Sequence, residues 1–258
     1  MNDQDLTKIT RSSMWGKITI RNLSDAEAAK VVTWWQLGLP AVHFEAFSLD
    51  DNNDHFLPTK TVYGTRLLND GQYSVWSAAG YASHREKSAD RGLAWCKEYL
   101  DKTIRELSYC PKDLVSDWHE QCDFDQVLYT GIELLGKADR TEDVVVNFFR
   151  ALPLSKEDYD TILWVCKAYY KLAFTIVATN REKVRKVANL FHTDGLILQS
   201  EVKKLFKDWG KPKDVGITLE VLEKELGACP VNGIDRSTFD LMTYSVLDFP
   251  GYGPIVKE

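Results

Sequence analysis

The sequence predicts an α+β N-terminal domain of order α-β-β-β-α with an antiparallel three-stranded sheet, followed by an all-helical region. Apolar Val42, Phe44 and Ala46 alternate with other side chains, which is the period of a β-strand. The tripeptide Asn69-Asp70-Gly71 is a strong hairpin signal between two β-rich segments. From Pro111 onward, apolar residues recur at helical spacing. We therefore expect two domains, at 14–108 and 109–250.

The composition is that of a globular protein. The chain has 258 residues, 44% of them hydrophobic and 27% charged, which makes a disordered chain improbable. The net charge of −6 argues against nucleic acid coating the whole surface, although it does not exclude one local basic face. Five cysteines, an odd number without a CxxC pair, predict free thiols in a reducing compartment. We expect an intracellular protein, cytoplasmic or nuclear.

No segment predicts a membrane span. The longest apolar stretch, Trp164–Ala178, is interrupted by Lys167 and Lys171 and is shorter than the ~20 residues that a membrane helix needs. The N-terminus is polar and lacks the pattern of a signal peptide. We therefore expect no membrane partner.

The first elements follow from local signals. Residues 1–13 are polar and are expected to form a loose tail, and Lys17–Ile20 a short strand. Ser24, with Glu27 three residues later, has the spacing of a capping box and predicts a helix start. Gly38, followed by Leu39 and Pro40, predicts its end.

The expected sheet and second helix come next. The first strand lies around 42–47, the second within Thr59–Leu67, and the third at Tyr73–Ser77 after the 69–71 turn. Ser83, with Glu86, predicts the cap of a long helix. The apolar stripe of that helix consists of Ala89, Leu93, Cys96, Leu100 and Ile104.

The remaining segments predict helices. Pro111 suits a first helical position, and Thr141 and Ser155 are expected N-caps. Tyr159–Thr179 is apolar on most sides, which predicts the central buried helix of this half. Further helices are expected at 181–191, 199–209, 218–226 and 236–247.

Residues 24–106 resemble the double-stranded RNA-binding domain. The likeness lies in the step from Gly38 to Glu45, the loop Asn53–Pro58, the hairpin Asp70–Tyr73 and the glycine-containing segment Gly80–Ala89. The resemblance implies that the protein binds structured or double-stranded RNA by its shape.

The resemblance also implies the binding residues. The first helix, with Glu27 and Lys30, and the loop with His55 would touch successive minor grooves. The start of the last helix would hold the intervening phosphates. Its contact residues would be His84, Arg85, Lys87 and Arg91.

The sequence departs from that family at the expected phosphate site, where Glu86 and Asp90 interleave with the basic residues. Across 17–106, eleven Lys and Arg stand against twelve Asp and Glu. A charge near zero weakens phosphate binding. The alternative function is therefore a protein–protein interaction adaptor that uses the same fold without RNA.

An enzyme is the third and least favoured reading. His43 and Glu45 on one strand face, with Tyr99 and Lys102 on a helix, resemble the residues of DNA-nicking enzymes, although ordinary surface residues are the favoured interpretation. The sequence contains no Gly-rich phosphate loop, GxSxG or HExxH motif. We expect a non-catalytic binding protein without a cofactor.

Two further groups could suggest metals. Cys110, His119 and Cys122, with Cys96 as a fourth member, match no zinc spacing, so core thiols are expected. The tandem helices of 181–247 resemble a degenerate EF-hand pair. In its first loop the first and third positions are Leu190 and His192, which cannot supply carboxylate oxygens. We therefore expect no metal site.

Overall fold

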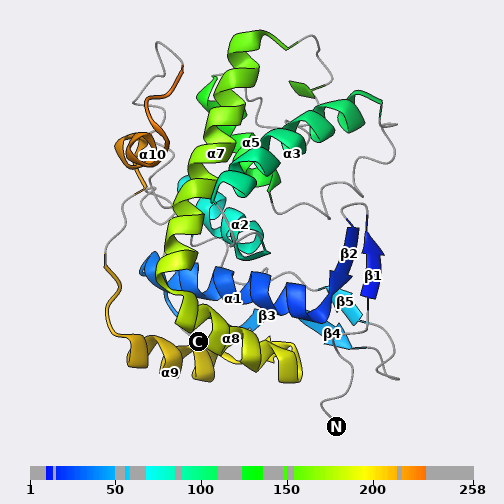
Figure 1. Ribbon diagram of the computed structural model, residues 1–258. Helices are drawn as coiled ribbons and strands as arrows, with labels where there is room; N and C mark the ends of the chain where they lie inside the picture. The colour runs from blue at the N-terminus through cyan, green and yellow to red at the C-terminus, as the bar shows by residue number, and fades with distance from the viewer. Residues whose placement is uncertain are drawn as a thin grey trace, which may run out of the picture. The chain divides into compact units, whose positions relative to one another are not determined.

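The computed structural model describes residues 10–13, 16–49, 56–58, 68–84, 89–109, 124–135, 148–149, 154–213 and 217–230. These residues are predominantly helical, and their strands form three two-stranded antiparallel sheets (Figure 1). The predicted three-stranded sheet is therefore wrong, and with it the α-β-β-β-α order. The described part of the expected all-helical region is mostly helical, but it also contains a two-residue strand, Leu196–Ile197, so the expectation of helices alone is wrong.

The chain divides into two compact units. Unit 1 comprises Met1–Leu67, Ala79–His84 and Thr175–Val215, and unit 2 comprises Leu68–Ala78, Arg85–Phe174 and Gly216–Glu258. Helices α2 (Asp70–His84) and α7 (Lys156–Thr179) contribute residues to both units. The predicted boundary near residue 108 falls inside unit 2, so the units do not follow the expected domains.

Helix α1 (Ile20–Gln36) is the core helix of unit 1. It begins four residues before the predicted start, because the Thr19 hydroxyl accepts a hydrogen bond from the Asn22 amide at 3.1 Å. Ser24 and Glu27 therefore lie inside the helix and are buried, and they form no capping box. The helix ends as predicted, with Gly38 at φ 72°.

The strands of unit 1 pair in three small sheets. β1 (Thr10–Ser13), in the expected tail, pairs with β2 (Gly16–Thr19). The predicted first strand is reduced to β3 (Phe44–Glu45), whose partner is β6 (Leu196–Ile197) far along the chain. β4 (Phe47–Leu49) pairs with β5 (Phe56–Pro58). Most of the predicted second strand, 59–67, lies outside the described residues.

Two further helices complete unit 1. Helix α8 (Arg181–Asp194) packs along α1, and α9 (Gln199–Trp209) follows after β6 (Figure 1). Their bounds agree closely with the predictions from sequence. Gly195 joins them at φ 68°, where a Cβ atom would overlap the carbonyl oxygen of Phe47. Glycine is therefore required at this position.

The predicted hairpin at 69–71 is the beginning of helix α2. The Asn69 side chain accepts a hydrogen bond from the Gln72 amide at 2.8 Å, and the Gln72 side chain accepts one from the Asn69 amide at 3.1 Å. This reciprocal pair caps a helix. The predicted strand Tyr73–Ser77 therefore lies inside α2, and Ser83 lies inside the same helix instead of capping the next one.

The described part of unit 2 is built from helices. They are the first part of α2, α3 (Ala89–Tyr109), α5 (Asp125–Leu134), the larger part of α7, and α10 (Leu219–Leu226). The Ser155 hydroxyl accepts a hydrogen bond from the Asp158 amide at 3.1 Å, which confirms the predicted cap of α7. The expected cap Thr141 and the expected helix at 236–247 lie outside the described residues.

An aromatic cluster fills the core of unit 2. Trp95 packs against Tyr99, Phe124 and Tyr170 with ring centroids 5.1 to 6.1 Å apart. Of the predicted stripe on α3, Cys96 and Leu100 are fully buried. Helix α3 approaches α7 so closely at Gly92 that a Cβ atom there would overlap the ring of Tyr170.

Helix α7 is long and apolar enough to cross a membrane by length and composition alone, and 67% of its most apolar 18-residue window is buried inside the protein. A buried core helix meets the same criteria of length and composition, and the sequence predicts a central buried helix here. Cys166 on this helix is fully buried, and burial, together with nearby Cys96, raises the pKa of its thiol. Cys96 itself is a core thiol, as expected, while Cys110, His119 and Cys122 lie outside the described residues.

Candidate functional site: a basic surface on helices α8 and α9

The helical hairpin of α8 and α9 concentrates positive charge in an acidic protein. The whole chain has 32 Lys and Arg against 38 Asp and Glu, whereas residues 181–213 contain nine basic against four acidic residues. The nine are Arg181, Lys183, Arg185, Lys186, Lys203, Lys204, Lys207, Lys211 and Lys213. All except half-buried Lys183 are exposed. We name these eight exposed residues the basic surface.

The apolar pattern of each helix directs these charges to solvent. Val184, Val187 and Phe191 of α8 are buried at steps of three and four, so Arg181, Arg185 and Lys186 fall on other sides of the helix. In α9 the buried face is formed by Val202 and Leu205. Lys203, Lys204 and Lys207 are displaced from this face and exposed.

The two ends of the hairpin are held at the C-terminal end of α1. The Trp35 indole donates a hydrogen bond to the Gly210 carbonyl at 3.0 Å, and the side-chain amide of Gln36 donates one to the Lys213 carbonyl at 2.6 Å. Asn180, which precedes α8, donates to the Gln36 side chain at 3.3 Å. The start of α8 and the segment after α9 therefore lie close together, and their basic residues belong to one region of unit 1.

Lys183 of α8 lies where the start of α8 meets the C-terminal end of α1. Its ammonium group lies 4.6 Å from the centroid of the Trp35 ring and donates a hydrogen bond to the Asn180 side chain at 2.8 Å. Both partners are neutral. Neither cancels the positive charge of the lysine, so an anion that approaches this end of the hairpin meets an ordered cation.

A hollow of about 310 Å³ adjoins helix α8. It is lined by Arg21, Asp25, Arg185, Ala188, Asn189 and His192. Arg21 and Arg185 are exposed and come from α1 and α8 respectively, so two guanidinium groups border one opening. The basic surface therefore continues from the outside of α8 toward α1.

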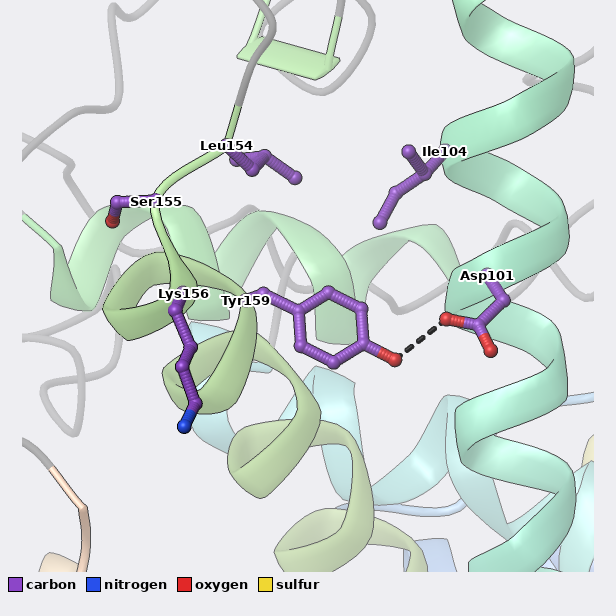
Figure 2. Close-up of a pocket in the computed structure, with 6 residues that line it drawn as sticks. All are labelled: Asp101, Ile104, Leu154, Ser155, Lys156 and Tyr159. Carbon is purple, nitrogen blue, oxygen red and sulfur yellow. Dashed lines mark hydrogen bonds between the residues drawn. The ribbon is translucent and has the colours of Figure 1, made fainter.

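Unit 2 contains a second hollow, of about 450 Å³, between the start of α7 and α3 (Figure 2). Figure 2 shows the Tyr159 hydroxyl pointing at Asp101, to which it donates a hydrogen bond of 2.6 Å, while Lys156 points away. Burial and the hydrogen bond to Asp101 raise the pKa of Tyr159. This hydrogen bond joins α7 to α3 at the edge of the hollow.

The structure describes four of the seven residues predicted from the RNA-binding resemblance. Glu27 and Lys30 are buried and form an ion pair with each other at 2.7 Å, so they cannot contact RNA in this conformation. Arg91 is exposed on α3. His84 is the last residue of α2. His55, Arg85 and Lys87 lie outside the described residues, so whether the predicted set forms one surface stays a prediction.

The residues considered for DNA nicking belong to two different units, with Tyr99 and Lys102 in unit 2. Tyr99 is 2% exposed and belongs to the aromatic core of unit 2, so it is not the surface residue that we expected. His43 and Glu45 are half-buried in unit 1.

β6, in the first EF-hand-like loop, pairs with β3. Within the described ranges, no three His, Cys, Asp or Glu residues are grouped as metal ligands would be.

No single motif in the sequence marks the basic surface. A count of charge along the chain identifies 181–213 without a structure. No protein-family model, curated protein or solved structure matches this chain.

Proposed function

We propose that this protein binds nucleic acid through the basic surface of α8 and α9. The single observation that carries the proposal is the concentration of exposed Lys and Arg over 181–213 in a chain of net charge −6. Neutralising phosphates releases condensed counterions, and this release supplies most of the affinity of a protein that contacts the nucleic-acid backbone. RNA and DNA share this backbone, so both are candidate ligands.

The spacing of the lysines supports contact with a phosphate chain. Lys203 and Lys207 are one helical turn apart on α9, and Lys211 follows four residues later, beyond Gly210. One turn rises about 5.4 Å, which is comparable to the separation of successive phosphates along a strand. Basic side chains one turn apart can therefore contact neighbouring phosphates.

The test measures binding of the full chain to fluorescent 20-nucleotide probes by anisotropy. The probes are single-stranded and duplex RNA and DNA, each at about 50 mM and 200 mM salt, because backbone binding weakens steeply over this range. We expect micromolar or tighter binding at the lower salt concentration. The triple variant Lys203→Glu, Lys204→Glu, Lys207→Glu should abolish it.

A charge-matched control separates the basic surface from general electrostatics. Arg105, Lys156 and Lys224 are exposed residues of unit 2, and changing all three to Glu alters the net charge by the same amount. We expect this control to bind nearly as tightly as the wild type. Absence of wild-type binding to any probe at low salt, or equal losses in both triple variants, would overturn the proposal.

The expected alternative, a protein-interaction adaptor, also has one observation in its favour. Leu190, Leu196 and Leu198 are exposed by 38%, 37% and 54%, and they lie together in sequence around β6. Exposed apolar residues that gather in one region are typical of interaction surfaces. If no probe binds, this alternative takes precedence over nucleic-acid binding.

A further inference from the structure

Aromatic residues alternate in sequence with the lysines of α9 and of the segment after it. Phe206 and Trp209 on α9 are half-buried, and their ring centroids are 5.8 Å apart with the planes inclined by 33°. The buried ring of Trp35 meets Trp209 edge to face, with centroids 5.4 Å apart and an interplanar angle of 77°. The Trp209 ring therefore packs against the buried Trp35 ring, and the Trp209 side chain remains partly exposed.

This arrangement is fixed on several sides. Trp35 is 7% exposed, and its indole N–H donates a hydrogen bond to the carbonyl of Gly210, the residue after Trp209. The bond from Gln36 to the Lys213 carbonyl holds the segment that carries Lys211 and Lys213. A ring that is already ordered loses little conformational entropy when a ligand stacks on it.

We propose that Trp209, with Phe206 beside it, is a stacking platform for an unpaired base, so that the preferred ligand is single-stranded nucleic acid. The inference rests on the proposed function and specifies the form of the ligand. Bases of a duplex are stacked on each other and cannot cover a protein ring, whereas bases of a single strand can. A positively charged groove combined with aromatic platforms is the general solution for single strands.

The packing of α9 supports this assignment. Val202 and Leu205 already form the buried face of the helix. Trp209 lies at the end of that face, one turn beyond Leu205, where the described chain covers the ring only in part. Lys207 and Lys211 flank it in sequence and are exposed, so a base on the ring would place its phosphates within reach of cations.

The first test compares an unstructured 20-nucleotide strand with its duplex, using the full chain and the Trp209→Leu variant. We expect the wild type to bind the single strand at least ~10-fold more tightly than the duplex. Losing one stacked base should weaken single-strand binding by roughly 5- to 150-fold and leave duplex binding unchanged. Trp209→Phe should restore part of the affinity, and Phe174→Leu, which alters a half-buried ring of unit 2, should have no effect.

A second measurement keeps the test decisive if Trp209→Leu perturbs folding. A single-stranded probe that carries 5-iodouridine is photocrosslinked to the wild-type protein, and the modified residue is identified by mass spectrometry. Crosslinks at Trp209 or Phe206 support the platform. Equal binding of strand and duplex with crosslinks elsewhere overturns the platform and leaves the basic surface standing, whereas failure of every probe to bind overturns the proposed function itself.

Discussion

Two helices in different units each carry a lysine paired with a carboxylate one turn away, and the surroundings of the two pairs are opposite. Lys30 and Glu27 of α1 lie 2.7 Å apart, with only 4% and 6% of their side chains exposed. Lys97 and Asp101 of α3 lie 2.5 Å apart, with 56% and 39% exposed. Helical spacing alone cannot tell the pairs apart, and burial decides what each contributes.

A third lysine extends this comparison to function. Lys183 is ordered by a neutral amide and a neutral ring, whereas Lys30 and Lys97 each face a carboxylate. A paired lysine has most of its charge compensated before a ligand arrives. We infer that the partners of a lysine, and not its presence alone, decide whether it can hold a phosphate.

The largest expected effect comes from breaking the buried pair. Lys30→Met removes the ammonium group that lies 2.7 Å from the buried Glu27 carboxylate. Breaking a buried ion pair in this way typically costs about 3–5 kcal/mol. We expect a loss of this size in the free energy of unfolding, measured by urea denaturation with circular dichroism. Because the pair is far from water, added salt should change the loss very little.

The double variant Glu27→Leu, Lys30→Met is the control for this prediction. Replacing both members of a buried pair by apolar residues of similar volume is often neutral, because the desolvation of both charges is removed together. We expect most of the lost stability to return. A double variant as unstable as the single one would show that the ion pair is not the source of the effect.

The second prediction tests whether partners determine binding. Lys183→Glu should reduce the affinity for a single-stranded probe about 10-fold or more at ~0.1 M salt, the contribution of one phosphate contact. Lys183→Gln should lower the salt slope by about one. Lys97→Glu changes the net charge equally, and we expect it to bind like the wild type. Comparable losses in Lys183→Glu and Lys97→Glu would contradict the comparison.

Sequence reasoning succeeded where one signal was long enough to dominate. Tyr159–Thr179 is apolar on most sides over many turns, and α8 and α9 have clear apolar stripes, so all three helices were predicted correctly. The 69–84 segment failed because its signals are ambiguous. Asn69 followed by Asp70 and Gly71 suits a turn, yet Asn69 and Gln72 also form a cap.

The candidate site shows the same division. The charge of 181–213 is readable from the sequence, but its neighbourhood with Trp35 depends on contacts across about 175 residues of chain. No local pattern places the Trp35 indole against the Gly210 carbonyl. The burial of Glu27 and Lys30 was also beyond the sequence, because charged residues on helices are usually solvated and here both are buried.

A smaller effect is expected at the exposed cluster of unit 2. Tyr159→Phe removes the hydroxyl that donates to Asp101 and leaves the ring in place. The bond is only partly buried, so the loss should fall at the low end of the ~0.5–1.5 kcal/mol typical of a hydrogen bond. Urea denaturation measures this loss. A loss as large as that of Lys30→Met would refute the claim that burial separates the two regions.

The smallest expected effect is a change in the titration of Asp101. Burial opposes its ionisation, but the hydrogen bonds from Lys97 and Tyr159 outweigh burial and lower the pKa of Asp101 below the ordinary 3.8. A lowered pKa in the folded protein stabilises it above the unfolded pKa, and this contribution disappears as the pH falls through the folded value. The contribution is therefore constant near neutral pH and is lost only below about pH 4.

Carboxyl NMR of the wild type and two variants tests the order of these causes. Lys97→Met should raise the titration midpoint of Asp101 more than Tyr159→Phe does, because the Lys97 hydrogen bond lowers the pKa more than that of Tyr159, and Lys97 also supplies a Coulombic attraction. With both changes, burial acts with little opposition, and the midpoint should rise at least to the ordinary value. An Asp101 midpoint that is the same in all three proteins would mean that the exposed pair is not formed in solution. In that case, pairing with Asp101 could not explain why Lys97→Glu is expected to leave nucleic-acid binding unchanged.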